Sequence, residues 1–169
     1  MQECAFRRWI LTVIPSRNAN RLHVIASDRT FFVTSSTWEK RSLLQSARAA
    51  TLFIDVLYHY RGQQKYLLHE FVAMPDHFHL LLTVGLDMTV EKAVHLVKGG
   101  FAFRAGRELG FRAPVWQKGF SEIRVNEREA FLAMREYIRE NPVKRFLANT
   151  AEDYPYSSAQ PRFELDPPT

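Results

Sequence analysis

Two histidines, His77 and His79, stand one residue apart in the apolar segment 77–84. The alternation of this segment predicts a β-strand, in which successive side chains point to opposite faces of the sheet. We therefore expect both imidazoles on one face and Phe78 on the other face, towards a core. Two adjacent imidazoles can bind one divalent metal ion. Two unrelated histidines on a half-buried strand would show the same spacing, so the pair becomes informative only together with a second element.

The second element is a helix expected over residues 127–141. Tyr137 and Asn141 are four residues apart, so they lie on the same side of this helix. A phenol can act as a nucleophile, and an amide oxygen can bind a cation. Taken alone, Tyr137 also suits a core position, and Asn141 also suits a cap before Pro142. Their chemistry therefore depends on what they meet in space.

Hydrophobic periodicity and turn residues indicate the elements that position these side chains. Strands are expected over residues 30–34, 65–73, 77–84 and 114–126, and helices over about 36–62, 90–110 and 127–141, with a short helix at 143–148. Pro142 is expected to break or redirect the third long helix. The order predicts an α+β fold, a ferredoxin-like βαββαβ antiparallel sheet with helices on one face. A C-terminal helix that carries the tyrosine is added to it.

Local signals mark the ends of the first two helices. The spacing of Ser36 and Glu39 fits a capping box that opens the first helix. Thr89 is expected to cap the second helix, and Gly110 is expected to end it. The pair Gly99–Gly100 lies inside the second helix. We interpret it as an interruption that indicates close approach of backbone or a ligand.

Composition and charge limit the class of protein. The chain has 169 residues, 46% of them hydrophobic, and a net charge of +5, which suits one folded domain and an anionic partner such as nucleic acid. The single cysteine excludes a disulfide framework and a cysteine-cluster metal site, and it fits a reducing cytoplasm. No segment is long and apolar enough for a transmembrane helix. We therefore expect a cytoplasmic location and no membrane partner.

Several motifs occur in an order and spacing that are specific in combination. They are TSSTWE (34–39), PDHFHLL (75–81), KGGF (98–101), VWQKGF (115–120), YIRENPV (137–143) and YPYSSA (154–159). Over about residues 28–160 the chain thereby resembles the REP-associated tyrosine transposases. These are single-tyrosine transposases of bacterial insertion sequences, with a His-hydrophobic-His (HUH) motif. The resemblance assigns residues 29–150 to an HUH transposase domain, 1–28 to an N-terminal extension of uncertain structure and 151–169 to a C-terminal tail.

The resemblance implies an endonuclease and strand transferase that acts on single-stranded DNA. His77 and His79 would hold a divalent metal ion, Mg²⁺ or Mn²⁺, with the amide oxygen of Asn141 as the third ligand. Tyr137 would attack the DNA backbone and form a 5′-phosphotyrosine intermediate, which conserves the bond energy for rejoining. The implied target is an imperfect hairpin of the REP type. The protein would act as a monomer or a homodimer.

Basic side chains near these elements are the candidate DNA contacts, because they can neutralise phosphates. For each of them, a solvated surface charge is the alternative interpretation. They are Lys98, Arg104 and Arg107 on the second helix, Lys118 and Arg124 on the fourth strand, and Lys144 and Arg145 after Pro142.

Three other functions share part of this pattern. A non-catalytic single-stranded nucleic-acid-binding module of ferredoxin-like fold would stack bases on Phe31, Phe71 and Phe78, but it would leave the paired histidines without a role. A relaxase or replication initiator would carry the same histidine motif, usually in a longer chain. A domesticated, inactive transposase would keep the fold. The presence of all three types of site residue does not favour inactivation.

Overall fold

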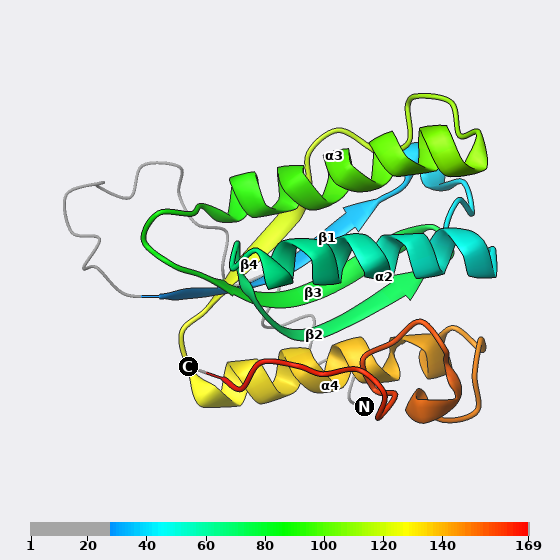
Figure 1. The fold of residues 1–169 in the computed structure, drawn as a ribbon. Helices are drawn as coiled ribbons and strands as arrows, with labels where there is room; N and C mark the ends of the chain where they lie inside the picture. Colours follow the sequence, from blue (N-terminus) through cyan, green and yellow to red (C-terminus); the bar gives the residue numbers. More distant parts are fainter. Residues whose placement is uncertain (1–27, 169) are drawn as a thin grey trace.

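The computed structural model of the chain describes residues 28–168 (Figure 1). The expected N-terminal extension therefore lies outside the described residues, except for Asp28. The elements are β1 (Arg29–Ser36), η2 (Trp38–Lys40), α2 (Ala47–Gly62), β2 (Leu67–Met74), β3 (His77–Val84), α3 (Val90–Leu109), β4 (Ser121–Val125), α4 (Arg128–Lys144) and η3 (Ala151–Asp153). Within this part of the chain, none of the helices has the length and hydropathy needed to cross a bilayer.

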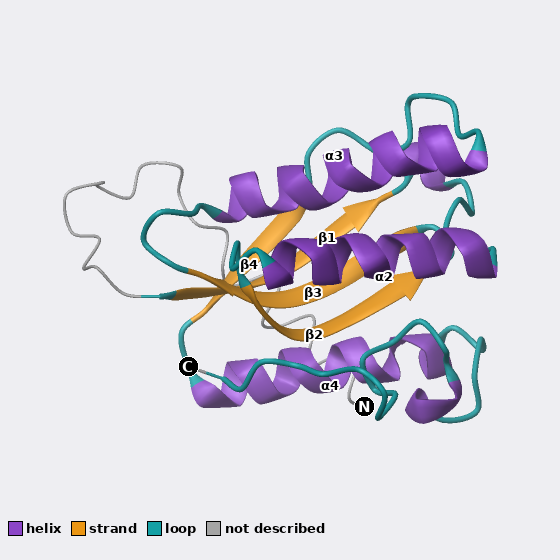
Figure 2. Ribbon diagram, viewed as in Figure 1, coloured by secondary structure: helices purple, strands orange, loops and turns teal. Residues whose placement is uncertain are grey.

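The four strands form one antiparallel sheet in the order β2-β3-β1-β4. Helices α2 and α3 pack on one face of the sheet, and α4 packs on the other (Figures 1 and 2). This is the βαββαβ arrangement with an additional C-terminal helix. The predicted α+β, ferredoxin-like fold is therefore confirmed.

Each face of the sheet has its own apolar core. On the first face, Phe53 of α2 packs against Phe78 of β3 and Phe101 of α3, with ring centroids 4.9 and 5.8 Å apart. On the second face, Met134 and Ile138 of α4 are buried against the sheet. Full burial of such a side chain contributes about 1.5–3 kcal/mol to folding. The second core is the one that fixes the late helix on the sheet.

Helix α2 begins later than the sequence predicts. Ser36 ends β1, and only the short 3₁₀ turn η2 follows, so the predicted capping box of Ser36 and Glu39 is wrong. The backbone N–H of Thr37 instead donates to a carbonyl of the β2–β3 turn at 2.9 Å. The helix is capped by Ser46, whose hydroxyl accepts a hydrogen bond from the N–H of Ala49 at 3.2 Å. Tertiary hydrogen bonds have overridden the local signal.

Helix α4 runs through Pro142 to Lys144, so the prediction that this proline breaks or redirects the helix is wrong. Pro142 lacks the N–H that would bond to the carbonyl of Ile138, but it is buried together with Met134, Ile138 and Asn141, so packing on the sheet holds the helix through this position. The helix is followed by Phe146 in a left-handed conformation, with φ of 57°. The N–H of Leu147 donates to the carbonyl of Pro142 at 2.9 Å. This turn replaces the short helix predicted over residues 143–148.

The predicted ends of α3 are confirmed, but the predicted interruption within it is wrong. The hydroxyl of Thr89 accepts a hydrogen bond from the first turn at 3.2 Å, and Gly110 ends the helix with φ of 71°. The helix is continuous through Gly99 and Gly100. A Cβ on Gly100 would lie 2.9 Å from Cε2 of Tyr60 on α2. The close approach that the glycine pair indicated is therefore one between two helices.

The strand boundaries vary in how well the sequence predicts them. Strand β3 has the predicted bounds, β1 is longer than predicted, and β2 is shifted by one or two residues. Strand β4 is limited to Ser121–Val125. The earlier part of the predicted fourth strand is a loop, and its Trp116 packs on Phe53, Phe78 and Phe101.

The segment after α4 returns along the outer edge of β2 (Figure 1). It contains η3 and an isolated antiparallel bridge between Ser157 and Val72, and is otherwise made of turns and irregular backbone. Three backbone hydrogen bonds join it to the strand: Ala73 N–H to the Tyr156 carbonyl at 2.9 Å, Ser158 N–H to the Phe71 carbonyl at 3.0 Å and Asp166 N–H to the Leu68 carbonyl at 2.9 Å. The tail is thus attached to the sheet along most of β2.

Candidate active site

The alternation of β3 brings His77 and His79 to the same face of the sheet, the face that α4 covers. Their ring centroids are 4.8 Å apart. Phe78, which lies between them in sequence, is buried in the opposite core with α2 and α3. The pair therefore has the arrangement that the period of a strand requires.

Helix α4 places its two polar candidates against this pair. The side-chain nitrogen Nδ2 of Asn141 lies 3.3 Å from Nε2 of His79. The ring of Tyr137 meets the ring of His79 nearly edge to face, with centroids 5.3 Å apart and an interplanar angle of 69°. The four residues predicted from spacing therefore lie together, and one chain supplies all of them.

Each imidazole is oriented by a partner on its Nδ1 atom. Nδ1 of His77 lies 2.6 Å from Oδ1 of Asp76, and Nδ1 of His79 lies 2.7 Å from Oγ1 of Thr34 on β1. Such contacts fix the tautomer and ring orientation and direct Nε2 towards a ligand. From the sequence, Asp76 is evident only as part of the motif PDHFHLL, with no role of its own. Thr34 could have been found only from the register of β1 against β3, which places it opposite His79.

The amide of Asn141 carries an unsatisfied acceptor. Asn141 is only 4% exposed, and its Oδ1 has no hydrogen-bond partner. A buried acceptor without a partner costs about 1–3 kcal/mol. Because the two ends of an amide are nearly identical in shape, a half-turn of the group would point Oδ1 at the position that now faces His79. One amide oxygen and two imidazole nitrogens form a donor set that suits a divalent ion.

Within residues 28–168, no three histidine, cysteine, aspartate or glutamate side chains come together in a way that could hold a metal ion. The amide of Asn141, which contacts His79, is therefore the candidate for a third protein ligand beside His77 and His79. The residues present fit the ion that the sequence predicts, and the orphaned Oδ1 is the observation that supports the fit.

Burial and nearby cations keep both imidazoles neutral. Burial, together with the smaller effects of the charges on His77 and Arg145, lowers the pKa of His79 to about 3. Burial also lowers the pKa of His77, although the hydrogen bond to Asp76 raises it in part. Neutral imidazole is the form that binds metal ions. The site is therefore ready for a cation at neutral pH.

Two of the candidate DNA contacts lie at this site. Nζ of Lys144 is 5.7 Å from the centroid of the Tyr137 ring. The backbone N–H of Arg145 donates to the carbonyl of Asn141 at 3.1 Å, and its charge lowers the pKa of both histidines. Both belong to the end of α4, where they place positive charge beside the tyrosine and the histidines.

Most of the other candidate DNA contacts have partners within the protein. Nζ of Lys98 donates to the carbonyls of Gln117 and Gly119 at 2.9 and 2.6 Å, and burial lowers its pKa. Lys118 is exposed in the loop before β4. The remaining pairs are Arg104 with Glu108 at 2.7 Å, Arg107 over the ring of Phe103 at 5.6 Å, and Arg124 with Asn126 at 3.0 Å. Those on α3 also lie on the opposite face of the sheet from α4.

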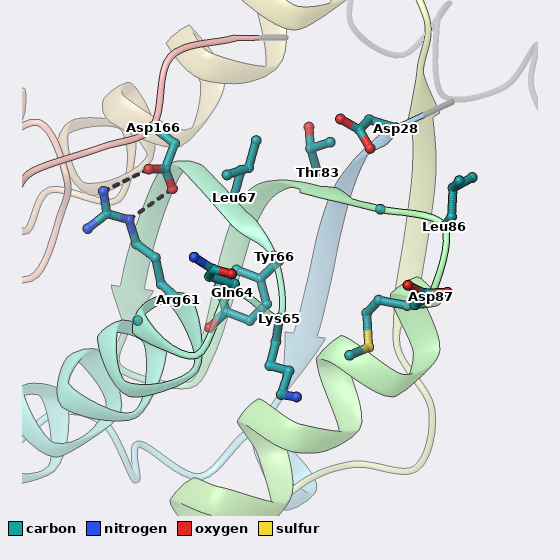
Figure 3. A pocket seen from close by; sticks show the side chains of 13 residues that line it. Asp28, Arg61, Gln64, Lys65, Tyr66, Leu67, Thr83, Leu86, Asp87 and Asp166 are labelled. Carbon is teal, nitrogen blue, oxygen red and sulfur yellow. Dashed lines mark hydrogen bonds and ion pairs between the residues drawn. The ribbon is translucent and has the colours of Figure 1, made fainter. Parts of the chain in front are cut away.

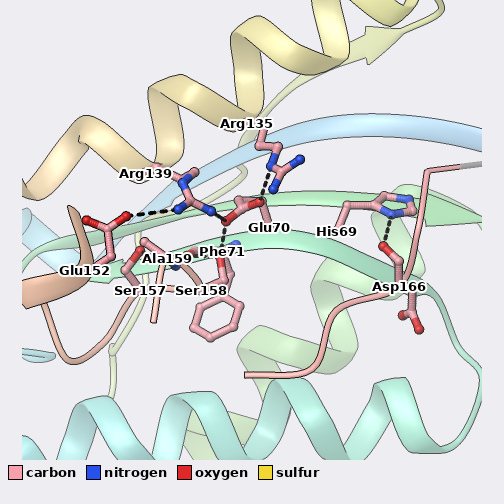
Figure 4. A network of polar contacts seen from close by, with 10 residues as sticks. All are labelled: His69, Glu70, Phe71, Arg135, Arg139, Glu152, Ser157, Ser158, Ala159 and Asp166. Atoms are coloured by element: carbon pink, nitrogen blue, oxygen red, sulfur yellow. Dashed lines mark hydrogen bonds and ion pairs between the residues drawn. The ribbon is translucent and has the colours of Figure 1, made fainter. Parts of the chain in front are cut away.

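A buried carboxylate holds α4 against β2 (Figure 4). Glu70 is fully buried, and its two oxygens lie 3.1 Å from Nε of Arg135 and 3.7 Å from a guanidinium nitrogen of Arg139. The hydroxyl of Ser158 in the tail donates to the same carboxylate at 2.8 Å. Tyr137 lies between the two arginines in sequence, so this network fixes the turn of the helix that carries the tyrosine. This network was not predicted, because nothing in the sequence shows which residues would pair with a glutamate inside an apolar strand.

A separate cleft lies at the other end of the sheet and has a volume of about 730 Å³. The ion pair of Arg61 and Asp166 forms one side of it, and Asp28 and Asp87 lie on the other (Figure 3). Its lining includes Thr83, near the end of β3 that is farther from the histidines. None of the predicted site residues lines this cleft.

The sheet aromatics cannot stack on nucleic-acid bases. Phe31, Phe71 and Phe78 are all buried in the core beneath α2 and α3. The binding-module alternative, in the form that uses these rings, is therefore excluded by the structure.

The fold and the site define an α+β protein in which a pair of histidines on a central strand faces a tyrosine and an asparagine on a C-terminal helix. The chain belongs to the family described as transposase IS200 like, whose model matches residues 29–141. This confirms the family that the motifs indicate, and with it a transposase role. No curated protein sequence matches the chain significantly.

Two solved structures share the fold. A REP-associated tyrosine transposase bound to a REP hairpin has a TM-score of 0.68 and 19% sequence identity, and the match covers 91% of this chain and 92% of that one. A protein from Deinococcus radiodurans R1, provisionally described as a transposase, has a TM-score of 0.53 and 18% identity, with 72% and 97% covered. At these identities the likeness concerns the fold.

Proposed function

We propose that the protein cleaves and rejoins single-stranded DNA at REP-like hairpins through a 5′-phosphotyrosine intermediate on Tyr137. The observation that carries this proposal is the convergence of His77, His79, Tyr137 and Asn141 in one chain. The similarly folded structure that contains a REP hairpin supports the choice of substrate. Because one chain supplies both halves of the site, a monomer suffices for the reaction.

The proposed metal ligands are His77, His79 and Asn141, with Mg²⁺ or Mn²⁺ as the ion. When bound, the ion would stabilise negative charge on the oxygens of the scissile phosphate. Asp76 and Thr34 hold the two imidazoles in place through Nδ1. The amide oxygen of Asn141 is the hard ligand that makes the set acceptable to these ions rather than to zinc or copper alone.

Tyr137 makes and breaks the covalent bond in this proposal. Its phenol oxygen attacks the phosphorus, the bond to the 3′ oxygen breaks, and that oxygen leaves as a hydroxyl after taking up a proton. The phenol proton passes to solvent. In the reverse step a 3′ hydroxyl attacks the phosphotyrosine, and the phenolate leaves. Lys144, with Nζ 5.7 Å from the centroid of the Tyr137 ring, provides positive charge near the phenol, which becomes anionic when it loses its proton.

The decisive experiment is the detection of a covalent protein–DNA adduct. The protein is incubated with Mn²⁺ and hairpin-bearing single-stranded DNA labelled at its 3′ end, and the products are separated on a denaturing gel. We expect an adduct with the wild type, none with Tyr137→Phe and none after chelation of the metal. Tyr60→Phe is the matched control, because Tyr60 lies on α2, on the other face of the sheet, and should not affect the adduct.

Two outcomes would contradict the proposal. An adduct that persists in Tyr137→Phe would show that another residue is the nucleophile. Hairpin binding by the wild type without any adduct would favour a non-catalytic single-stranded nucleic-acid-binding module.

A further inference from the structure

Phe146 has two properties that disfavour it in the folded state. Its side chain is 95% exposed, so its ring loses almost no contact with water when the chain folds. Its φ is 57°, in the left-handed region that glycine tolerates and bulky residues avoid. An exposed aromatic ring in a strained backbone conformation does not stabilise the fold. Such an outlier points to a role in binding.

The position of Phe146 indicates what it binds. It directly follows Lys144 and Arg145, which place positive charge beside Tyr137 and the two histidines. The backbone N–H of Arg145, the residue before Phe146, donates to the carbonyl of Asn141 at 3.1 Å, so the turn that carries Phe146 adjoins the last helical turn of the candidate active site. Positive charge next to an exposed aromatic ring is the combination that binds single-stranded nucleic acid.

The turn that carries Phe146 is fixed by hydrogen bonds. Its own N–H donates to the carbonyl of Val143 at 3.0 Å, and the N–H of Leu147 donates to that of Pro142 at 2.9 Å. Leu147 is itself 44% exposed and extends the apolar surface. The ring is therefore presented on a defined turn at the end of α4.

We propose that Phe146 is a stacking platform for an unpaired base of the DNA strand next to the phosphate attacked by Tyr137. Lys144 and Arg145 neutralise the phosphates on either side of that base. This inference rests on the proposed function, because it requires single-stranded DNA at the site. It adds a contact to one particular unpaired nucleotide, which the catalytic residues do not provide.

The test uses Phe146→Tyr and Phe146→Leu as a matched pair. Tyrosine keeps an aromatic face, whereas leucine keeps apolar bulk without one. The probes are a DNA hairpin with a single-stranded 5′ extension, in which the fluorescent base 2-aminopurine replaces one unpaired base at a time, and the same hairpin without the extension. Stacking of 2-aminopurine on an aromatic ring quenches its fluorescence.

We expect quenching at one unpaired position with the wild type and with Phe146→Tyr, and none at that position with Phe146→Leu. Affinity of Phe146→Leu for the extended hairpin should be at least about fivefold weaker, while affinity for the hairpin without an extension stays unchanged. Phe146→Gly should bind as weakly as Phe146→Leu but melt no lower than the wild type, because glycine suits the observed φ. This last variant separates lost binding from lost folding.

The experiment distinguishes a failure of the stacking platform from a failure of the proposed function. Equal quenching and affinity for the wild type and Phe146→Leu, with the adduct on Tyr137 still formed, would overturn the stacking platform and leave the proposed function intact. A wild type that neither binds the extended hairpin nor forms the adduct would overturn the proposed function and this inference together. A wild-type dimer that Phe146→Leu converts to a monomer would assign the ring to a contact between two copies and overturn the inference.

Discussion

The amide of Asn141 and the imidazole of His79 meet at 3.3 Å, although 62 residues separate them in sequence. The contact joins the late helix to the central strand and leaves Oδ1 of Asn141 buried without a partner. A helix that served only to cover the sheet would place an apolar side chain here. The polar contact therefore indicates that α4 is positioned for chemistry as well as for packing.

Asn141→Leu tests whether the orphaned amide is kept for a metal ion. In EDTA the variant should melt close to the wild-type Tm, because it removes the orphaned Oδ1 but leaves Nε2 of His79 without its donor, and each unsatisfied buried group costs about 1–3 kcal/mol. Saturating Mn²⁺ should raise the wild-type Tm by about 5–10 °C and leave the variant unchanged. Differential scanning fluorimetry gives both values, and Asn149→Ala, at an exposed position, is the control. An equal Mn²⁺ response in Asn141→Leu would rule out the amide as a ligand.

Protonation of His69 should account for part of the pH dependence of the free energy of unfolding. Its Nδ1 donates to the Asp166 carbonyl at 3.0 Å and its Nε2 accepts from the Thr83 hydroxyl at 2.7 Å, so the neutral ring is satisfied. Burial lowers its pKa below the ordinary value of 6.5. The unfolded chain therefore takes up the proton first, and the stability that His69 contributes above pH 6.5 is lost as the pH falls below it.

Urea unfolding in EDTA between about pH 7.5 and about pH 5 measures this effect. For one histidine, the free energy of unfolding should fall by at most about 1.4 kcal/mol per pH unit. His69→Gln should show a shallower decline than the wild type over the same range. His77 and His79 remain in the variant, and because their pKa values are also lowered, some decline should persist. Identical slopes for the two proteins would contradict the role assigned to His69.

The adjacent glycines of α3 should respond oppositely to the same substitution. Gly99→Ala should stabilise the protein by up to about 1 kcal/mol, because nothing lies within 4 Å of the added Cβ and alanine favours a helix. Gly100→Ala should destabilise it by about 1–3 kcal/mol, because its Cβ would be 2.9 Å from Tyr60. Combining Gly100→Ala with Tyr60→Leu should recover much of the loss. Urea unfolding of the four proteins checks the pattern, and equal effects at the two glycines would refute it.

Substitution of Lys98 should affect folding, whereas substitution of Lys144 should affect DNA binding. Lys98→Gln should lower the Tm, because it removes hydrogen bonds to the carbonyls of Gln117 and Gly119. Its effect on the affinity for a DNA hairpin should be small. Lys144→Gln should leave the Tm unchanged, weaken binding and reduce the salt slope by about 0.7–0.9. Fluorescence anisotropy over a range of salt concentrations makes the comparison. An unchanged slope for Lys144→Gln would remove Lys144 from the DNA contacts.

The elements that the sequence predicts well are those whose signals are local. Strand β3 is bounded by a proline turn and a glycine, and Thr89 and Gly110 mark α3 through their own backbone conformations. The start of α2 is mispredicted because Thr37 bonds to a distant turn. Pro142 is mispredicted because the buried face of α4, which includes Ile138 and Pro142 itself, keeps the helix packed on the sheet through the proline.

The same distinction holds for the candidate site. A strand places every second side chain on one face, which predicts that His77 and His79 lie together. A helix places residues four apart on one side, which predicts the same for Tyr137 and Asn141. Their meeting requires the sheet order and the placement of α4, which the sequence indicates only through the family resemblance. Three further residues could not be predicted from local patterns. The role of Thr34 depends on the register of β1 against β3, that of Glu70 on a buried ion pair, and that of Phe146 on its backbone angle φ.

The tail along β2 has a consequence for the solution behaviour of the protein. An outer strand with free N–H and carbonyl groups is a template on which other chains can add as further strands. Strand β2 is long and apolar, which makes its bare edge prone to aggregation. The bonds from Tyr156, Ser158 and Asp166 occupy that edge. Shortening the chain after α4 would therefore favour insoluble, edge-paired assemblies before any change in DNA chemistry could be observed.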